Sequence, residues 1–233
     1  MKANIIYNMD CLDGLRQLPD KCVDLIISDP PYYFGENFKG AGRFGDRQNY
    51  KDIEELNEPL NYEVLDECLR VLKAPNIYIW TNKTQLGAYI SYFENKGCKT
   101  DLLTWHKNNP TPATSNNYLS DTEYCLFFRN GARLYGTYET KKKYWITSTN
   151  QKEKAKYGHP TIKPLEIIKQ LVINSSQGGG LVIDPYMGSG TTALACKILG
   201  RQYIGYEINP EYVKLAEARL KDARGLDRWG AFA

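Results

Sequence analysis

Residues 181–192, Leu-Val-Ile-Asp-Pro-Tyr-Met-Gly-Ser-Gly-Thr-Thr, join a short apolar run to a glycine-rich turn. The apolar run predicts a buried strand of a parallel sheet, and the residues after Gly190 predict a helix. A further strand ends in Glu207. A strand, a tight glycine turn and a helix, with an acid at the end of the next strand, is the general design of a nucleoside-binding half-sheet. In that design Gly188 and Gly190 allow close approach of the backbone to a ligand, and Glu207 can accept hydrogen bonds from two ribose hydroxyls.

Two other nucleotide-binding motifs compete for this stretch. The phosphate-binding P-loop needs Lys and then Ser or Thr after its last glycine, whereas Thr191 follows Gly190 here, so that interpretation fails. The dinucleotide fingerprint G-x-G-x-x-G/A is satisfied by Gly188, Gly190 and Ala193. A dehydrogenase therefore stays open on this stretch alone, although no obvious acid or base for hydride transfer accompanies it.

A second motif, Asp29-Pro30-Pro31-Tyr32, follows another predicted buried strand, Val23 to Ser28. Consecutive prolines end a strand, lack N–H donors and restrict the preceding residues to extended conformations. An acid, a carbonyl-presenting turn and an aromatic ring thereby meet at the carboxyl end of a strand, where open α/β sheets bind ligands. This arrangement suits a planar group that carries an exocyclic amine. The structural alternative is a proline turn with Tyr32 packed beneath it.

Strands and helices alternate along the chain, which predicts an α/β fold with one doubly wound, mostly parallel sheet and a single domain over 1–233. We expect strands at 4–8, 23–28, 76–80, 99–107, 123–129, 181–184 and 203–207. We expect helices over 12–18, 59–73, 83–96, 164–177 and 191–199, and a last one after Asn209. The stretch 35–51 has no such pattern, and we interpret it as a mobile cover over the Asp29 motif.

The composition excludes several classes of protein. The 233 residues carry a net charge of only +3 and contain no apolar run of signal-peptide or membrane-spanning length. Six cysteines are scattered without a C-x-x-C pair, and there are two histidines, so no metal site is expected. Reduced thiols fit a cytoplasmic protein.

The positive charge is concentrated in one segment. Residues 129–163 contain nine Lys or Arg against two Glu, with tyrosines and Trp145 between them. Such a segment suits a polyanion that also offers flat rings, although a solvated basic loop explains the charge equally well. No core pattern is visible there, so we interpret about 130–158 as a short insertion.

The two motifs together resemble the amino-group DNA methyltransferases that use S-adenosylmethionine. The resemblance rests on 29–32 and 184–192, on His159-Pro160-Thr161-Ile162-Lys163-Pro164, and on Trp105-His106-Lys107-Asn108-Asn109-Pro110, which is similar to a stretch in adenine-specific members. The catalytic motif precedes the glycine motif, as in the circularly permuted β group. Tyr186 stands where the family usually has Phe, and the insertion is short for a target-recognition region.

The resemblance implies a seven-stranded, Rossmann-like methyltransferase fold that acts on DNA, specifically on the N6 amine of adenine. Asp29 and the Pro30 carbonyl would accept hydrogen bonds from that amine, and Tyr32 would stack on the flipped-out base. The same architecture supports N4 methylation of cytosine, but members acting on cytosine more often carry Ser at position 29. RNA adenine methylation and a catalytically silent DNA-binding partner are further alternatives.

The resemblance also implies the binding residues. For S-adenosylmethionine they are Asp10, Thr161, Lys163, Asp184, Pro185, Met187, Gly188, Ser189, Gly190, Thr191 and Glu207. Asp10 could equally be a helix N-cap and Lys163 an ordinary surface lysine. For DNA the candidates are Lys39, Arg43, Lys107, Asn109, Lys141, Lys142 and Lys143. A homodimer is compatible with the sequence.

Overall fold

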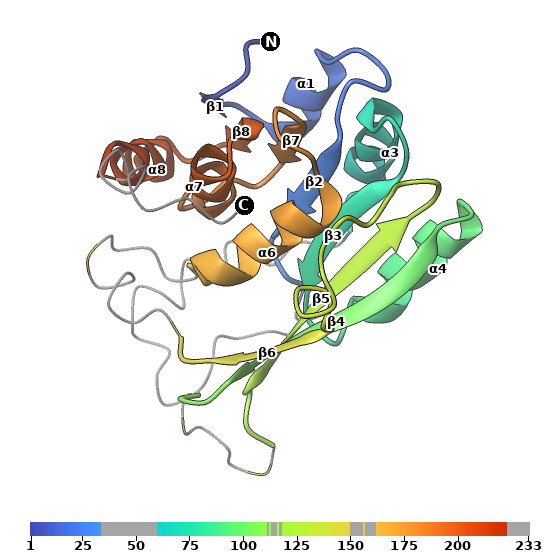
Figure 1. Cartoon of the computed structure of the whole chain (residues 1–233), viewed down its shortest axis with the longest axis vertical. Helices are drawn as coiled ribbons and strands as arrows, with labels where there is room; N and C mark the ends of the chain where they lie inside the picture. The colour runs from blue at the N-terminus through green and yellow to red at the C-terminus, as the bar shows by residue number, and fades with distance from the viewer. Residues whose placement is uncertain are drawn as a thin grey trace.

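The computed structural model describes residues 1–33, 60–110, 112, 116, 118–149, 156 and 162–222. An eight-stranded sheet in the order β1-β8-β7-β2-β3-β5-β4-β6 forms the centre of the molecule (Figure 1). Its strands are β1 (Ile5–Asn8), β2 (Leu25–Ser28), β3 (Asn76–Thr81), β4 (Lys99–Lys107), β5 (Thr122–Arg129), β6 (Tyr144–Thr147), β7 (Leu181–Asp184) and β8 (Gln202–Glu207). The helices within the described ranges are α1 (Cys11–Arg16), α3 (Tyr62–Val71), α4 (Leu86–Asn95), α6 (Leu165–Ser175), α7 (Thr191–Ile198) and α8 (Pro210–Asp222).

Helices cover both faces of this sheet. Apolar residues of α6, α7 and α8 form one core with one face of the strands, and those of α1, α3 and α4 form a second core with the other face. The strands β2 and β3 are buried along their whole length, which explains their continuous apolar sequences. The doubly wound fold predicted from the alternating elements is therefore confirmed. Every helix of the described residues is too short or too polar to cross a lipid bilayer.

Among the described strands only β5 runs against its neighbours. It pairs antiparallel with both β3 and β4, whereas β1, β8, β7, β2 and β3 form a continuous parallel series. The predicted strand over 99–107 is matched residue for residue by β4. Because the parallel strands point the same way, their carboxyl ends meet at one edge of the sheet.

The expected number of seven strands is wrong, since β6 adds an eighth at the edge beside β4. This strand lies inside the basic segment: Tyr144 and Ile146 are exposed, whereas Trp145 and Thr147 are half-buried. Tyr-Trp-Ile-Thr consists of residues that favour strands, but the run has only four residues, shows no alternation and follows three lysines.

The basic segment is fastened to helix α6 in its described part. The main-chain N–H of Tyr135 donates to the carbonyl of Asn174 (2.7 Å), and the Thr140 carbonyl accepts hydrogen bonds from the side chains of Gln170 (3.0 Å) and Asn174 (2.7 Å). Gly136 passes so close to α6 that a Cβ there would lie 1.8 Å from Asn174 Oδ1. The segment therefore packs on the helix rather than projecting as a free loop.

The glycine turn between β7 and α7 is held from two sides. Asp184 accepts hydrogen bonds from the main chain of Tyr186 (3.0 Å) and from the Thr192 hydroxyl (2.6 Å). On the other side, the buried guanidinium of Arg219 donates to Ser189 O (2.6 Å) and to the hydroxyls of Ser189 (3.1 Å) and Thr191 (3.0 Å). The turn is thus supported from β7 and α7 on one side and from α8 on the other.

Two of the turn's residues have left-handed backbone angles. Gly188 has φ 49° and Gly190 has φ 79°. At Gly190 a Cβ would also lie 2.7 Å from the Cβ of Ala216 on α8. The expected role of this glycine, closeness to a ligand, is therefore joined by a packing role that the motif alone did not predict.

The stability of the fold is expected to depend on the protonation of Asp184. Burial raises the pKa of its carboxyl to about 7, and the charges of Asp29 and Glu207 act in the same direction. The folded chain then keeps a proton that the unfolded chain loses near pH 4, so the free energy of unfolding falls between about pH 4 and pH 7, by at most about 1.4 kcal/mol per pH unit.

This dependence can be measured by urea unfolding of the wild type and Asp184→Asn between pH 5 and pH 8. The difference in the free energy of unfolding, wild type minus variant, is expected to decrease as the pH rises. Parallel pH profiles for the two proteins would contradict the assignment.

Candidate active site

Four neighbouring parallel strands each end in, or are followed by, a carboxylate. The strands lie in the spatial order β1, β8, β7, β2 (Figure 1). The residues at their ends are, in the same order, Asp10, Glu207, Asp184 and Asp29. The row brings together acids from both ends of the sequence, because β1 pairs with β8 and β2 with β7. Such an edge concentrates negative charge at the position where open α/β sheets bind ligands.

The turn that carries Asp29 is fixed to the neighbouring strand–helix unit. The main-chain N–H of Tyr33 donates to Gln85 Oε1 (3.0 Å), and the Asn82 side chain donates to the Tyr33 carbonyl (2.7 Å). Inside the turn the Tyr32 hydroxyl donates to Asp29 Oδ1 (2.8 Å). Burial and the neighbouring carboxylates raise the pKa of Tyr32 well above its usual value, so the phenol keeps the proton that it donates.

Lys163 lies at this turn, immediately before α6, and is buried. Its ammonium nitrogen is 2.6 Å from Asp29 Oδ2, 3.3 Å from Tyr32 Oη and 3.2 Å from Glu123 Oε2. Burial alone would lower the pKa of Lys163, but the carboxylates of Asp29 and Glu123 outweigh it and raise the pKa, so the group stays charged. The alternative of an ordinary surface lysine is therefore wrong.

Glu123 is a site residue that the sequence analysis missed. It lies on β5, and its Oε1 pairs with Lys107 Nζ at 2.7 Å. Burial alone would raise the pKa of this carboxyl, but the two ammonium groups lower it to about 2. The available signal was a lone acid at the start of the predicted strand Glu-Tyr-Cys-Leu-Phe-Phe, where an unpaired charge would be costly.

Glu207 connects the end of β8 to the glycine turn. Its Oε2 accepts the N–H of Gly188 (2.8 Å) and its Oε1 accepts the N–H of Asn209 (2.8 Å). Burial raises the pKa of this carboxyl above its ordinary value. The side chain remains partly exposed, so each oxygen can accept a further hydrogen bond.

The remaining cofactor candidates divide into two groups. The side chains of Asp184, Pro185, Met187, Ser189 and Thr191 are buried, and those of Ser189 and Thr191 contact Arg219, so they support the turn from beneath. Asp10 is exposed and caps α1 by accepting from the N–H groups of Leu12 (2.8 Å) and Asp13 (3.3 Å). Its capping role is thus confirmed, while its contact to a ligand stays a prediction. Thr161 lies outside the described residues.

The predicted DNA contacts are dispersed. Lys39, Arg43, the 35–51 cover and most of 150–158 lie outside the described residues. Lys107 is mostly buried against Glu123, and Asn109 accepts a hydrogen bond from the main chain of Thr149 (2.8 Å). Of the lysines before β6, Lys142 pairs with Glu139 (2.5 Å), Lys143 pairs with Asp101, and Lys141 is exposed.

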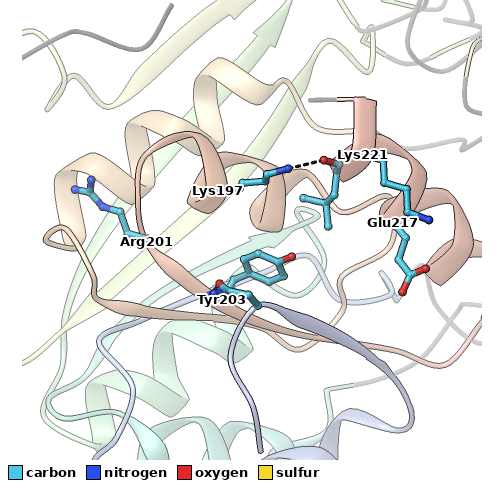
Figure 2. A pocket seen from close by; sticks show the side chains of 7 residues that line it. Lys197, Arg201, Tyr203, Glu217 and Lys221 are labelled. Atoms are coloured by element: carbon cyan, nitrogen blue, oxygen red, sulfur yellow. Dashed lines mark hydrogen bonds between the residues drawn. The ribbon is translucent and has the colours of Figure 1, made fainter. Parts of the chain in front are cut away.

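A hollow of about 850 Å³ lies at the opposite end of β8 from Glu207 (Figure 2). Lys197, Arg201, Tyr203, Glu217 and Lys221 line it, and Lys197 Nζ donates to the carbonyl of Leu220 (2.7 Å). The hollow takes no part in the row of carboxylates. Within the ranges that the structure covers, no group of His, Cys, Asp or Glu side chains is arranged to hold a metal ion.

The comparisons with known proteins agree with this geometry. A model of the N6/N4 DNA methylase family matches residues 23–218. The type II methyltransferase M2.DpnII of Streptococcus pneumoniae is 31% identical over 93% of this chain and 89% of its own. The DNA adenine methyltransferase YhdJ of Escherichia coli K12 is 29% identical, over 94% and 83%.

Among solved structures, the complex of M1.HpyAVI with S-adenosylmethionine superposes with a TM-score of 0.69 and 27% identity, covering 92% of this chain and 98% of that one. The family match thus includes both the Asp29 turn and the glycine turn, which the sheet places at the ends of adjacent strands. The chain belongs to the N6/N4 family of DNA methylases.

Proposed function

We propose that this chain transfers a methyl group from S-adenosylmethionine to the N6 amine of adenine in DNA. The observation that carries the proposal is the adjacency of two turns: the one with Asp29 follows β2, and the one with Gly188 follows its paired neighbour β7. An acceptor for an amine therefore lies beside a turn suited to a nucleoside.

The residues at this edge fit the methyl donor. S-adenosylmethionine supplies the methyl group on a positively charged sulfur, and its zwitterionic amino acid end adds no net charge. A row of carboxylates suits such a ligand electrostatically. In this proposal Glu207 accepts hydrogen bonds from the ribose hydroxyls and the Gly188 turn lines the amino acid end. Asp10, beyond the end of β1, accepts from the adenine amine.

Asp29 and the Pro30 carbonyl act on the target amine. The lone pair of an adenine amine is delocalised into the ring, which makes the nitrogen a poor nucleophile. Two acceptors on its two N–H groups draw the nitrogen towards tetrahedral geometry and localise the lone pair. As the N–C bond forms, the methyl–sulfur bond would break and S-adenosylhomocysteine would leave with the electron pair. The nitrogen then carries a positive charge and loses a proton, for which Asp29 is the proposed acceptor.

Tyr32 contributes through both parts of its side chain. Its hydroxyl orients the Asp29 carboxylate through the 2.8 Å hydrogen bond, and its half-buried ring offers a surface on which the flipped-out base stacks. Adenine is favoured over cytosine because position 29 is Asp, and the relative YhdJ is named a DNA adenine methyltransferase.

Replacing Asp29 with Ala is expected to reduce methyl transfer by about 1,000-fold or more, because the principal acceptor of the amine is lost. Binding of S-adenosylmethionine should stay within a few-fold of the wild type. The measurement is methyl transfer to mixed-sequence DNA, followed by digestion and mass spectrometry of the nucleosides.

The matched control is Asp66→Ala, which removes an exposed carboxylate on α3, in the layer that also holds α4, and should retain activity. Near-normal turnover by the Asp29 variant would refute the role of this motif. N4-methylcytosine as the product would keep the fold and overturn the choice of base.

DNA binding is expected to weaken steeply with salt, because phosphate contacts supply most of the affinity. Replacing Lys141, Lys142 and Lys143 together with Gln should reduce the slope of log K against log[salt] by about 1 or more. Lys96→Gln, on the α3–α4 side, should leave the slope unchanged. Fluorescence anisotropy with a labelled duplex between about 50 and 200 mM salt measures the slope for the wild type and for each variant. Affinity that does not change with salt would argue against these lysines as the contact.

A further inference from the structure

Lys163 occupies a position that a contact with the cofactor does not explain. An ammonium group has three N–H donors, and three oxygens lie within 3.3 Å of this one: Asp29 Oδ2, Glu123 Oε2 and Tyr32 Oη. Only 9% of its side chain is exposed, so water has little access to replace a partner. All three contacts lead to the catalytic turn or to the strand β5 beside it.

We propose that Lys163 is the positioning residue for the Asp29 carboxylate, and that Glu123 holds Lys163 in place and balances its charge. This inference rests on the proposed function, because it concerns how Asp29 is presented to the target amine.

The orientation of Asp29 depends on having two partners on different oxygens. A carboxylate oxygen can accept two hydrogen bonds. Tyr32 occupies one site on Oδ1, and Lys163 occupies one on Oδ2. With both oxygens tied, the carboxylate cannot rotate about its Cβ–Cγ bond without breaking a contact, and each oxygen keeps one site for the amine. The acceptor is therefore oriented before the base arrives, which is the condition for a positioned group to accelerate a reaction.

The carboxylate of Glu123 compensates the positive charge of Lys163. Methyl transfer places a positive charge on the amine nitrogen, and an uncompensated ammonium beside Asp29 would oppose that charge. Glu123, kept ionised by its low pKa, lies 3.2 Å from Lys163 and offsets it. Lys107 in turn offsets the remaining charge of Glu123 at 2.7 Å. Two carboxylates and two ammonium groups thus form a neutral set around the reacting atoms.

The test separates this role from a contact with the cofactor. Lys163→Met is expected to lower kcat about 100-fold, the scale of a misplaced reacting group, while the Kd for S-adenosylmethionine changes less than threefold. Kd is measured by calorimetry on the DNA-free protein, and kcat at saturating cofactor and DNA. Lys169→Met is the matched control, since it removes a lysine on α6 whose partner Glu166 is exposed, and kcat should not change.

A second variant keeps the test valid if loss of Lys163 unfolds the chain. Glu123→Gln preserves the shape of the side chain and removes only its charge, so kcat should fall with Kd unchanged. The double variant of Lys163→Met and Glu123→Gln should lose no more activity than Lys163→Met alone, because the charge of Glu123 then has no ammonium at the catalytic turn to balance.

The outcomes are distinguishable. A tenfold or larger rise in Kd for S-adenosylmethionine with kcat unchanged in Lys163→Met would assign the lysine to the cofactor and overturn the inference alone. Additive losses in the double variant would also overturn it. A wild-type protein that binds S-adenosylmethionine but methylates neither adenine nor cytosine would overturn the proposed function, and the inference with it.

Discussion

Carboxylates placed side by side at the ends of parallel strands repel one another, and much of the structure around the site reduces that repulsion. Asp184 accepts hydrogen bonds from two donors, and burial raises its pKa to about 7, so that it need not be fully charged at neutral pH. Glu207 takes two main-chain N–H groups, and Asp29 takes an ammonium and a phenol. The charge of each of these three acids is therefore reduced or compensated in a different way, and a cationic ligand would relieve the remaining repulsion.

Asp184 and Asp29 have different hydrogen-bond and charge partners because they have different roles. Asp184 lies beneath the turn and works as a structural acceptor for α7, which a protonated carboxyl can still partly fulfil. Asp29 is proposed to accept hydrogen bonds from an amine, and its two oxygens are held by a buried ammonium and a phenol. A buried ion pair is a costly way to gain stability, so its presence here points to a need for orientation rather than for folding energy.

The sequence predicted the parts of this arrangement that are local. Strand β4 and strand β7 were predicted with their observed bounds, and the Asp10 and Asn209 caps were visible from side chains next to helix starts.

The contacts of Lys163 could not be predicted in this way, because Asp29 and Glu123 are 134 and 40 residues from it in the chain and meet it only through the order of the sheet. Arg219 was missed for the same reason, since nothing in a surface-like helix sequence shows that one arginine turns inward to bind a loop 30 residues away. Strand β6 was missed because its run of strand-favouring residues is only four residues long and follows three lysines.

The close passage of Gly136 over Asn174 has a consequence for exchanging the basic segment between members of this family. The segment contacts α6 largely through its own main chain, so most of its side chains can change without disturbing the helix. Position 136 is the exception, because a Cβ there would lie 1.8 Å from Asn174 Oδ1 and 2.3 Å from Thr140 Oγ1. A segment transplanted from a relative must therefore bring a glycine to this point, or smaller residues must stand at 140 in the segment and at 174 in the helix that receives it. In a chimera, the residues at positions 136 and 174 therefore have to come from the same parent protein.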